Sequence, residues 1–148
     1  MLKKVCLSIL MVVLCLTGGF AMIQTLSVDE LVKMADLIAI AKLKEIKPTD
    51  KSPEGFQKLE NTIVLEEILK GEEKKGDERT FITFSGLEDN PTIASDGLFL
   101  IFLTKTASQT WDLTNLIQGY WPFLKDGRLG GMGLRYNLDI VKQAINKK

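Results

Sequence analysis

The sequence predicts an α+β fold that is mainly β: a small antiparallel OB-like barrel of about five strands, with a short N-terminal helix and a C-terminal helix. Three observations favour this fold class. The 148 residues, of which 45% are hydrophobic and 26% charged, suit one globular domain. Most apolar runs between residues 37 and 124 alternate in period two or are rich in β-branched and aromatic residues, as strands are. Helices are predicted at residues 28–35 and in the segment after Asn137, near the two ends of the domain.

Residues 1–21 have the layout of a secretory signal peptide. Two lysines precede an apolar run from Val5 to Leu16, and the small residues Gly19 and Ala21 have the spacing that signal peptidase prefers. We therefore expect cleavage after Ala21, which leaves residues 22–148 as a single exported domain in the periplasm, the cell envelope or the medium. The alternative is an uncleaved membrane anchor, and this segment is the only membrane contact that we expect.

The composition excludes several kinds of chemistry. The chain has no histidine, so serine-histidine or cysteine-histidine catalysis and histidine-ligated zinc are excluded within it. Both cysteines, Cys6 and Cys15, lie in the signal segment, so the mature domain is expected to have no disulfide. Loss of Lys3 and Lys4 leaves 17 basic and 19 acidic residues, a net charge of −2, which argues against a nucleic-acid partner. We expect no cofactor and no metal.

The first helix is predicted from Val28 to about Ala35. Ser27 and Glu30 have the spacing of a capping box, in which each side chain bonds the other residue's backbone N–H. The run from Leu37 to Ile40 is then apolar at every position, and residues 41–44 alternate with lysine. This change of period predicts a first strand that directly follows the helix.

A loop is predicted over Lys47–Lys58, because this stretch contains two prolines, a glycine and several charges. Leu59–Leu69 alternates as a second, long strand, with a possible bulge where Glu66 and Glu67 interrupt the pattern. A helix is the alternative for this segment. The charged stretch Lys70–Arg79 is a turn with two glycines.

The later strands are shorter. Thr80–Phe84 is rich in β-branched and aromatic residues, and Leu98–Leu103 is apolar at every position, which predicts a strand buried on both faces or closing a barrel. Short strands are predicted around Trp111, Leu113 and Tyr120–Leu124. The remaining features are a turn at Asp126-Gly127, a flexible connection at Gly130, Gly131 and Gly133, and a helix capped by Asn137.

The order "ADLIAIAKLKEI", loop, "TIVLEEILKG", turn, "TFITFSG", loop, "GLFLIFL" resembles the OB-type barrel of netrin modules and tissue inhibitors of metalloproteinases, and small exported bacterial proteins of that plan. The resemblance covers about residues 35–103 and implies a fold. Those inhibitors use an N-terminal cysteine to chelate the protease zinc, together with several disulfides. Since the mature chain has no cysteine, their mechanism transfers to no residue here. The landmarks are Ala35-Asp36, Lys70-Gly71 and Gly97.

The candidate ligand-binding residues are Trp111, Tyr120 and Trp121. OB-type barrels often bind through one sheet face and its loops, where exposed aromatic side chains provide contact area. The alternative is that these side chains fill the core, because a domain without disulfides needs large buried groups.

No catalytic residue is expected. The acidic pairs have neighbouring side chains that point to opposite faces of a strand or lie in turns, and none of the candidate serines has a nucleophile motif. The glycine-rich stretch 126–133 lacks the lysine and spacing of a phosphate loop. The acidic pairs are Glu66-Glu67, Glu72-Glu73, Asp77-Glu78 and Glu88-Asp89, and the serines are Ser85, Ser95 and Ser108.

These observations predict an exported, non-enzymatic binding module at the cell envelope, with a protein or a small ligand as its partner and no nucleic acid. Two alternatives stay open. One is a membrane-anchored accessory or structural subunit, and the other is a hydrolase that depends on carboxylates.

Overall fold

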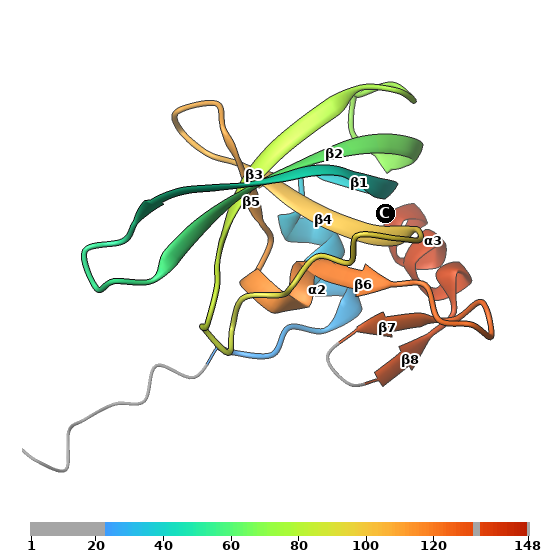
Figure 1. Ribbon diagram of the computed structural model, residues 1–148. Helices are drawn as coiled ribbons and strands as arrows, with labels where there is room; N and C mark the ends of the chain where they lie inside the picture. Colours follow the sequence, from blue (N-terminus) through green and yellow to red (C-terminus); the bar gives the residue numbers. More distant parts are fainter. Residues whose placement is uncertain (1–22, 132–133, 148) are drawn as a thin grey trace, which may run out of the picture.

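The computed structural model describes residues 23–131 and 134–147, so the expected signal segment lies outside the described residues. Figure 1 shows a curled sheet with a helix near each end of the described chain. The elements are α2 (Val28–Met34), β1 (Leu37–Lys51), β2 (Gln57–Lys70), β3 (Glu78–Phe84), β4 (Phe99–Lys105), β5 (Trp111–Leu113), the 3-10 helix η1 (Leu116–Gly119), β6 (Tyr120–Pro122), β7 (Leu129–Gly131), β8 (Leu134–Tyr136) and α3 (Leu138–Asn146).

Five strands form a closed barrel in the order β1-β2-β3-β5-β4, and β4 pairs back with β1. This closed arrangement is compatible with an OB-like barrel and confirms the predicted fold class. The sheet is mixed, because β3 and β5 run in the same direction and pair through Phe81 and Trp111. The sixth strand, β6, pairs with the edge of β4 opposite β1, next to β5.

The first five residues of β1 and of β4 are buried on both faces, as predicted from their apolar runs. Leu37–Ala41 pairs with Phe99–Leu103, and alternate residues point into two separate cores. One core fills the barrel and the other lies between the barrel wall and the helices. The barrel core includes Leu37, Ala39, Ile63, Phe81, Ile101 and Tyr120, and the helix-side core includes Leu31, Ile38, Leu100, Phe102, Trp121 and Val141.

Both helices begin at the predicted caps. The Ser27 N–H donates to Glu30 Oε2 at 2.8 Å, and the Glu30 N–H donates to Ser27 Oγ at 3.3 Å. At α3, the Asp139 N–H donates to Asn137 Oδ1 at 3.1 Å. Within the described ranges, neither helix has the length and apolar character needed to cross a membrane.

The predicted loop at Lys47–Lys58 is wrong for most of its length. The two long strands continue through it as a paired ribbon that ends in a turn at residues 52–56 (Figure 1). Pro48 pairs with Leu59, and β2 pairs on its other edge with β3 as far as Lys58. Proline is tolerated there because β1 pairs with β4 only as far as Ala41, and beyond that point one edge of β1 has no neighbouring strand.

The second strand contains the predicted bulge. Ile40 pairs with Glu67 and Ala41 pairs with Leu65, so Glu66 is the extra residue on β2. The helical alternative for this segment is therefore wrong.

The glycine connection predicted near residue 130 is also wrong in the described part. Leu129–Gly131 is a strand that pairs with β8. A Cβ at Gly131 would lie 2.6 Å from the Trp121 ring, so only glycine lets β7 pass this close to the indole. Gly133 lies outside the described residues.

Candidate functional site

The structure separates the three candidate aromatic residues, and Trp121 lies in the helix-side core. Its side chain is 1% exposed. Its ring stacks on Tyr136 with centroids 4.5 Å apart and contacts Phe102 at 4.9 Å. The indole N–H donates to the Gln118 carbonyl at 2.7 Å. Trp121 is therefore a core residue, which is the alternative that the sequence left open.

Tyr120 lies inside the barrel. It is 8% exposed, and its ring contacts Phe99 with centroids 5.1 Å apart. Its hydroxyl accepts the Ala94 N–H at 3.0 Å, and burial raises the pKa of the Tyr120 hydroxyl. Tyr120 and Trp121 thus belong to different cores and form no shared contact surface with Trp111.

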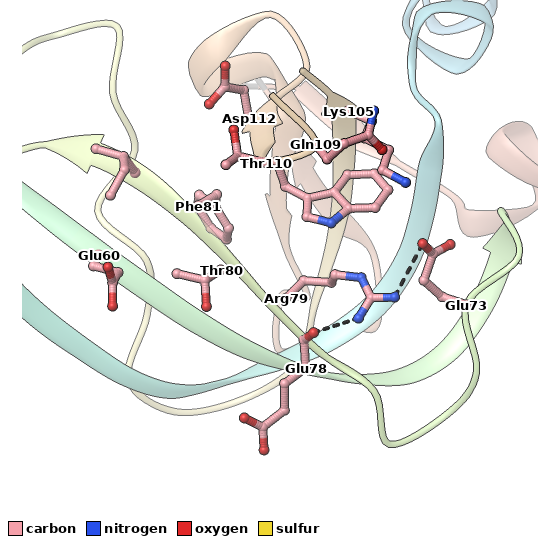
Figure 2. A pocket seen from close by; sticks show the side chains of 12 residues that line it. Glu60, Glu73, Glu78, Arg79, Thr80, Phe81, Lys105, Gln109, Thr110 and Asp112 are labelled. Carbon is pink, nitrogen blue, oxygen red and sulfur yellow. Dashed lines mark hydrogen bonds and ion pairs between the residues drawn. The ribbon is translucent and has the colours of Figure 1, made fainter. Parts of the chain in front are cut away.

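Trp111 is half-buried and borders an open surface. Two cations lie over its ring: Arg79 Cζ at 5.8 Å and Lys105 Nζ at 5.7 Å from the ring centroid, both within cation–π range. Arg79 is held by Glu73, with Nη2 3.3 Å from Oε1, and by the Glu78 carbonyl, which accepts from Nη1 at 2.6 Å (Figure 2). These contacts fix the indole at the edge of the barrel.

A surface hollow of about 590 Å³ lies beside Trp111, between β2, β3 and the end of the β4–β5 connection. A second hollow shares Glu73, Lys105, Gln109 and Trp111 with it and continues toward Asp36. Trp111 therefore lines two adjoining depressions.

The hollow also continues in the other direction. A third depression shares Glu60, Ile82 and Asp112 with the Trp111 hollow. A fourth shares Lys58 and Phe84 with the third and reaches Phe56 at the tip of the β1–β2 ribbon. We call these four connected depressions the β3 groove, because β3 lines three of them.

Two aliphatic side chains are exposed in the β3 groove: Ile82 is 37% exposed and Leu116 is 41% exposed. Leu116 has φ of 53°, and the preceding Asn115 has φ of 52°. This left-handed conformation costs an L-residue about 1–3 kcal/mol. The Asn115 amide holds it by donating to Gln118 Oε1 at 2.7 Å and to the Gln24 carbonyl at 2.9 Å. The fold thus holds an exposed leucine in a strained backbone at the groove.

The β3 groove is acidic. Seven carboxylates and three basic side chains line it. Among the residues that the structure describes, only Glu73 and Glu78 of these seven form ion pairs, with Arg79 and Lys44. The seven are Asp36, Glu54, Glu60, Glu72, Glu73, Glu78 and Asp112.

The acidic pair Glu66-Glu67 forms no carboxylate dyad. Glu66 binds Lys42 at 2.6 Å and Lys75 at 3.7 Å, whereas Glu67 contacts Lys142 of α3 at 3.5 Å. In the part of the chain that the structure describes, no three acidic side chains gather closely enough to hold a metal ion.

Sequence reasoning found Trp111 but missed Glu60, Ile82 and Leu116. Ile82 reads as an ordinary strand residue, and the left-handed backbone at Leu116 has no glycine to signal it. The alternation of Thr80, Ile82 and Phe84 on the outer side of β3 was the available signal. Comparison with known protein families and with curated proteins finds no match to this chain.

Proposed function

We propose that this protein is an exported, non-enzymatic binding module of the cell envelope that holds a protein ligand in the β3 groove. The observation that carries the proposal is a groove that combines two exposed aliphatic side chains, Ile82 and Leu116, with the half-buried indole of Trp111. Aromatic and aliphatic groups set in a hollow with a polar rim are typical of the centre of a protein interface.

The position of the β3 groove supports the same role. OB-type barrels bind ligands on the face of their second and third strands, between the loops that follow strands one and four. Here β2, β3, the ribbon tip and the β4–β5 connection all line the groove. This support is an analogy at the level of the fold. The strand order also favours a barrel of the netrin-module type, which we include in the proposal.

Other features support export and the lack of enzymatic activity. The first 21 residues have the pattern of a signal peptide, and the chain contains no histidine. The groove cation Arg79 is already engaged with Glu73.

The test is site-specific photo-cross-linking in the native cells, with the full chain carrying a C-terminal affinity tag. A photoreactive residue replaces Ile82 in the groove or, as the control, Ile140, which is 45% exposed on α3. We expect a discrete protein adduct from position 82 and none from position 140. Leu116→Asp or Trp111→Ala should reduce the adduct. Equal cross-linking at both positions, or no effect of either substitution in folded protein, would contradict the proposal.

A further inference from the structure

The β3 groove has an excess of negative charge that the rest of the domain does not share. Residues 22–148 include 17 basic and 19 acidic side chains, a net charge of −2. The groove lining alone includes three basic and seven acidic side chains, a net charge of −4. The other side chains of this segment therefore have a small positive net charge, and an occupant of the groove meets a local negative potential.

Two of these carboxylates line both the aromatic and the aliphatic parts of the groove. Glu60 and Asp112 line both the Trp111 hollow and the hollow that contains Leu116. Glu60 lies opposite Ile82 across the β2–β3 pair, and Asp112 follows Trp111 in β5. Neither carboxylate forms an ion pair of 4.0 Å or less with any described residue. Lys47 lies opposite Glu60 across the β1–β2 pair, but its ammonium group binds Glu45 at 3.0 Å.

We propose that the β3 groove binds an extended segment of another polypeptide in which a lysine or arginine is flanked by apolar side chains. The cation binds Glu60 or Asp112, which flank Ile82 on the neighbouring strands β2 and β5, and its apolar neighbours pack on Ile82 and Leu116. This inference rests on the proposed function and names the chemistry of the partner. Its two parts match two observations on one surface: exposed apolar side chains and an excess of carboxylates over basic side chains.

The strained backbone at Leu116 is independent support. A protein keeps an aliphatic residue at positive φ only where the surrounding structure holds it there, and such positions concentrate at ligand-contact sites. Asn115 and Gln118 supply that support from beneath the turn. The position therefore presents Leu116 to the groove at a cost in backbone energy.

Other occupants fit less well. A nucleic acid or another phosphate ligand would bring its negative charge against Glu60 and Asp112. A free metal ion needs several converging oxygen ligands, and no such group of three exists among residues 23–131 and 134–147. A row of connected hollows along one strand instead suits an extended chain, whose alternate side chains can enter successive depressions.

The test is selection of a random hexapeptide library displayed on phage against the immobilised full chain. We expect enrichment of peptides that combine lysine or arginine with apolar residues. Synthetic versions should bind Glu60→Gln/Asp112→Asn about tenfold more weakly than the wild type. The matched control is Glu67→Gln, the same change on the side of β2 that contacts α3, which should leave the affinity unchanged.

A second readout needs no variant. Affinity of the selected peptides for the wild type should fall between 0.05 and 0.5 M salt, and replacing their basic residue by glutamate should abolish binding. Circular dichroism shows whether the double variant folds. If the double variant does not fold, the salt dependence of binding to the wild type and the loss of binding by the charge-reversed peptide test the inference.

Enrichment of acidic or uncharged peptides, no enrichment above an empty support, or equal binding by the wild type and the folded double variant would overturn the inference. Preferential binding of single-stranded DNA would do the same. If position 82 still cross-links to a protein, only the chemistry of the partner is wrong. If that cross-link is also absent, the proposed function is wrong as well.

Discussion

Individual side chains show how tightly the helix-side core is built around Trp121. Its indole lies between Phe102 and Tyr136, and its N–H is satisfied by the Gln118 carbonyl. Gly131 closes the remaining side, because three ring atoms lie within 2.7 Å of the position that a Cβ would take. A buried indole with four fixed neighbours has little freedom to move away from an added methyl group.

Gly131→Ala should therefore destabilise the protein by about 1–3 kcal/mol, the usual cost of overpacking a core. Gly130→Ala is the matched control, since its Cβ would meet only the Leu124 side chain, at 3.2 Å. Urea unfolding followed by tryptophan fluorescence measures both. Equal loss of stability in the two variants would show that Trp121 does not set the requirement for glycine.

Tyr120 should make the stability of the protein depend on pH in the alkaline range. Burial raises the pKa of the Tyr120 hydroxyl above its ordinary value near 10. Its stabilising contribution is therefore fully present below that value and is lost as the pH rises through the folded-state pKa. Tyr120→Phe removes both the titration and the bond from the Ala94 N–H.

We expect Tyr120→Phe to be less stable than the wild type by about 1 kcal/mol at pH 7. This difference should shrink above pH 10, because only the wild type then has a buried phenol to ionise. Urea unfolding of both proteins between pH 7 and 11 measures the difference. If the difference in stability between the two proteins stays constant over this range, the Tyr120 hydroxyl is in contact with water.

The sequence did not distinguish the three aromatic residues from one another. Trp111, Tyr120 and Trp121 follow similar local patterns, and their different burial depends on partners from distant elements. Arg79 from β3 holds Trp111 at the surface, whereas Tyr136 from β8 covers Trp121. Only the assembled fold brings these partners together.

At the scale of elements, local signals were reliable where neighbouring residues make the structure. The capping box at Ser27 and Glu30 was readable because both partners lie in one turn. The bulge at Glu66 was readable because it interrupts the alternation of β2. The ribbon could not be predicted in this way, because a proline such as Pro48 normally indicates a loop. Only the assembled sheet shows that this part of β1 is an edge, where proline is tolerated.

Ser27→Ala should lower the stability by about 1 kcal/mol, the usual effect of removing an N-cap hydroxyl. The reason is that the Glu30 N–H loses its acceptor at the first turn of α2. Ser27→Asp should restore most of the stability, because its carboxylate accepts the same N–H. Chemical unfolding compares the three proteins. Full stability in Ser27→Ala would mean that α2 is held by its core contacts alone.

At the scale of the whole molecule, the barrel depends on pairings that the sequence does not specify. One of these pairings joins Phe81 and Trp111 in parallel strands separated by β4 and two connections. Strand order along the chain was enough to predict the fold class. The β3 groove was missed because its walls come from β2, β3 and β5, whose adjacency is a property of the closed barrel.

Acid should destabilise the whole molecule through its exposed carboxylates. The Ser27 hydroxyl lowers the pKa of Glu30, Lys42 lowers that of Glu66, and Arg128 lowers that of Asp126. A lowered folded-state pKa gives stability that is present above the unfolded-state value and is lost as the pH falls. We therefore expect stability to be constant from pH 8 to about 6 and to fall below about pH 5.

Urea midpoints at pH 7, 5 and 3 measure this loss. The part due to Glu66 and Asp126 should be smaller in 0.5 M salt, because exposed ion pairs are screened. A midpoint that rises as the pH falls would reverse the sign of the expected effect.

The two ends of the β3 groove are supported unequally. Trp111 belongs to the closed barrel, whereas Phe56 lies in the turn of residues 52–56 that joins β1 to β2, beyond the last residue of β2 that pairs with β3. A shift of this turn breaks no barrel pairing, so the end of the groove at Phe56 can change in width while both cores stay intact. A module built this way can hold segments of different bulk at that end and keep the same charge and aromatic contacts at the other.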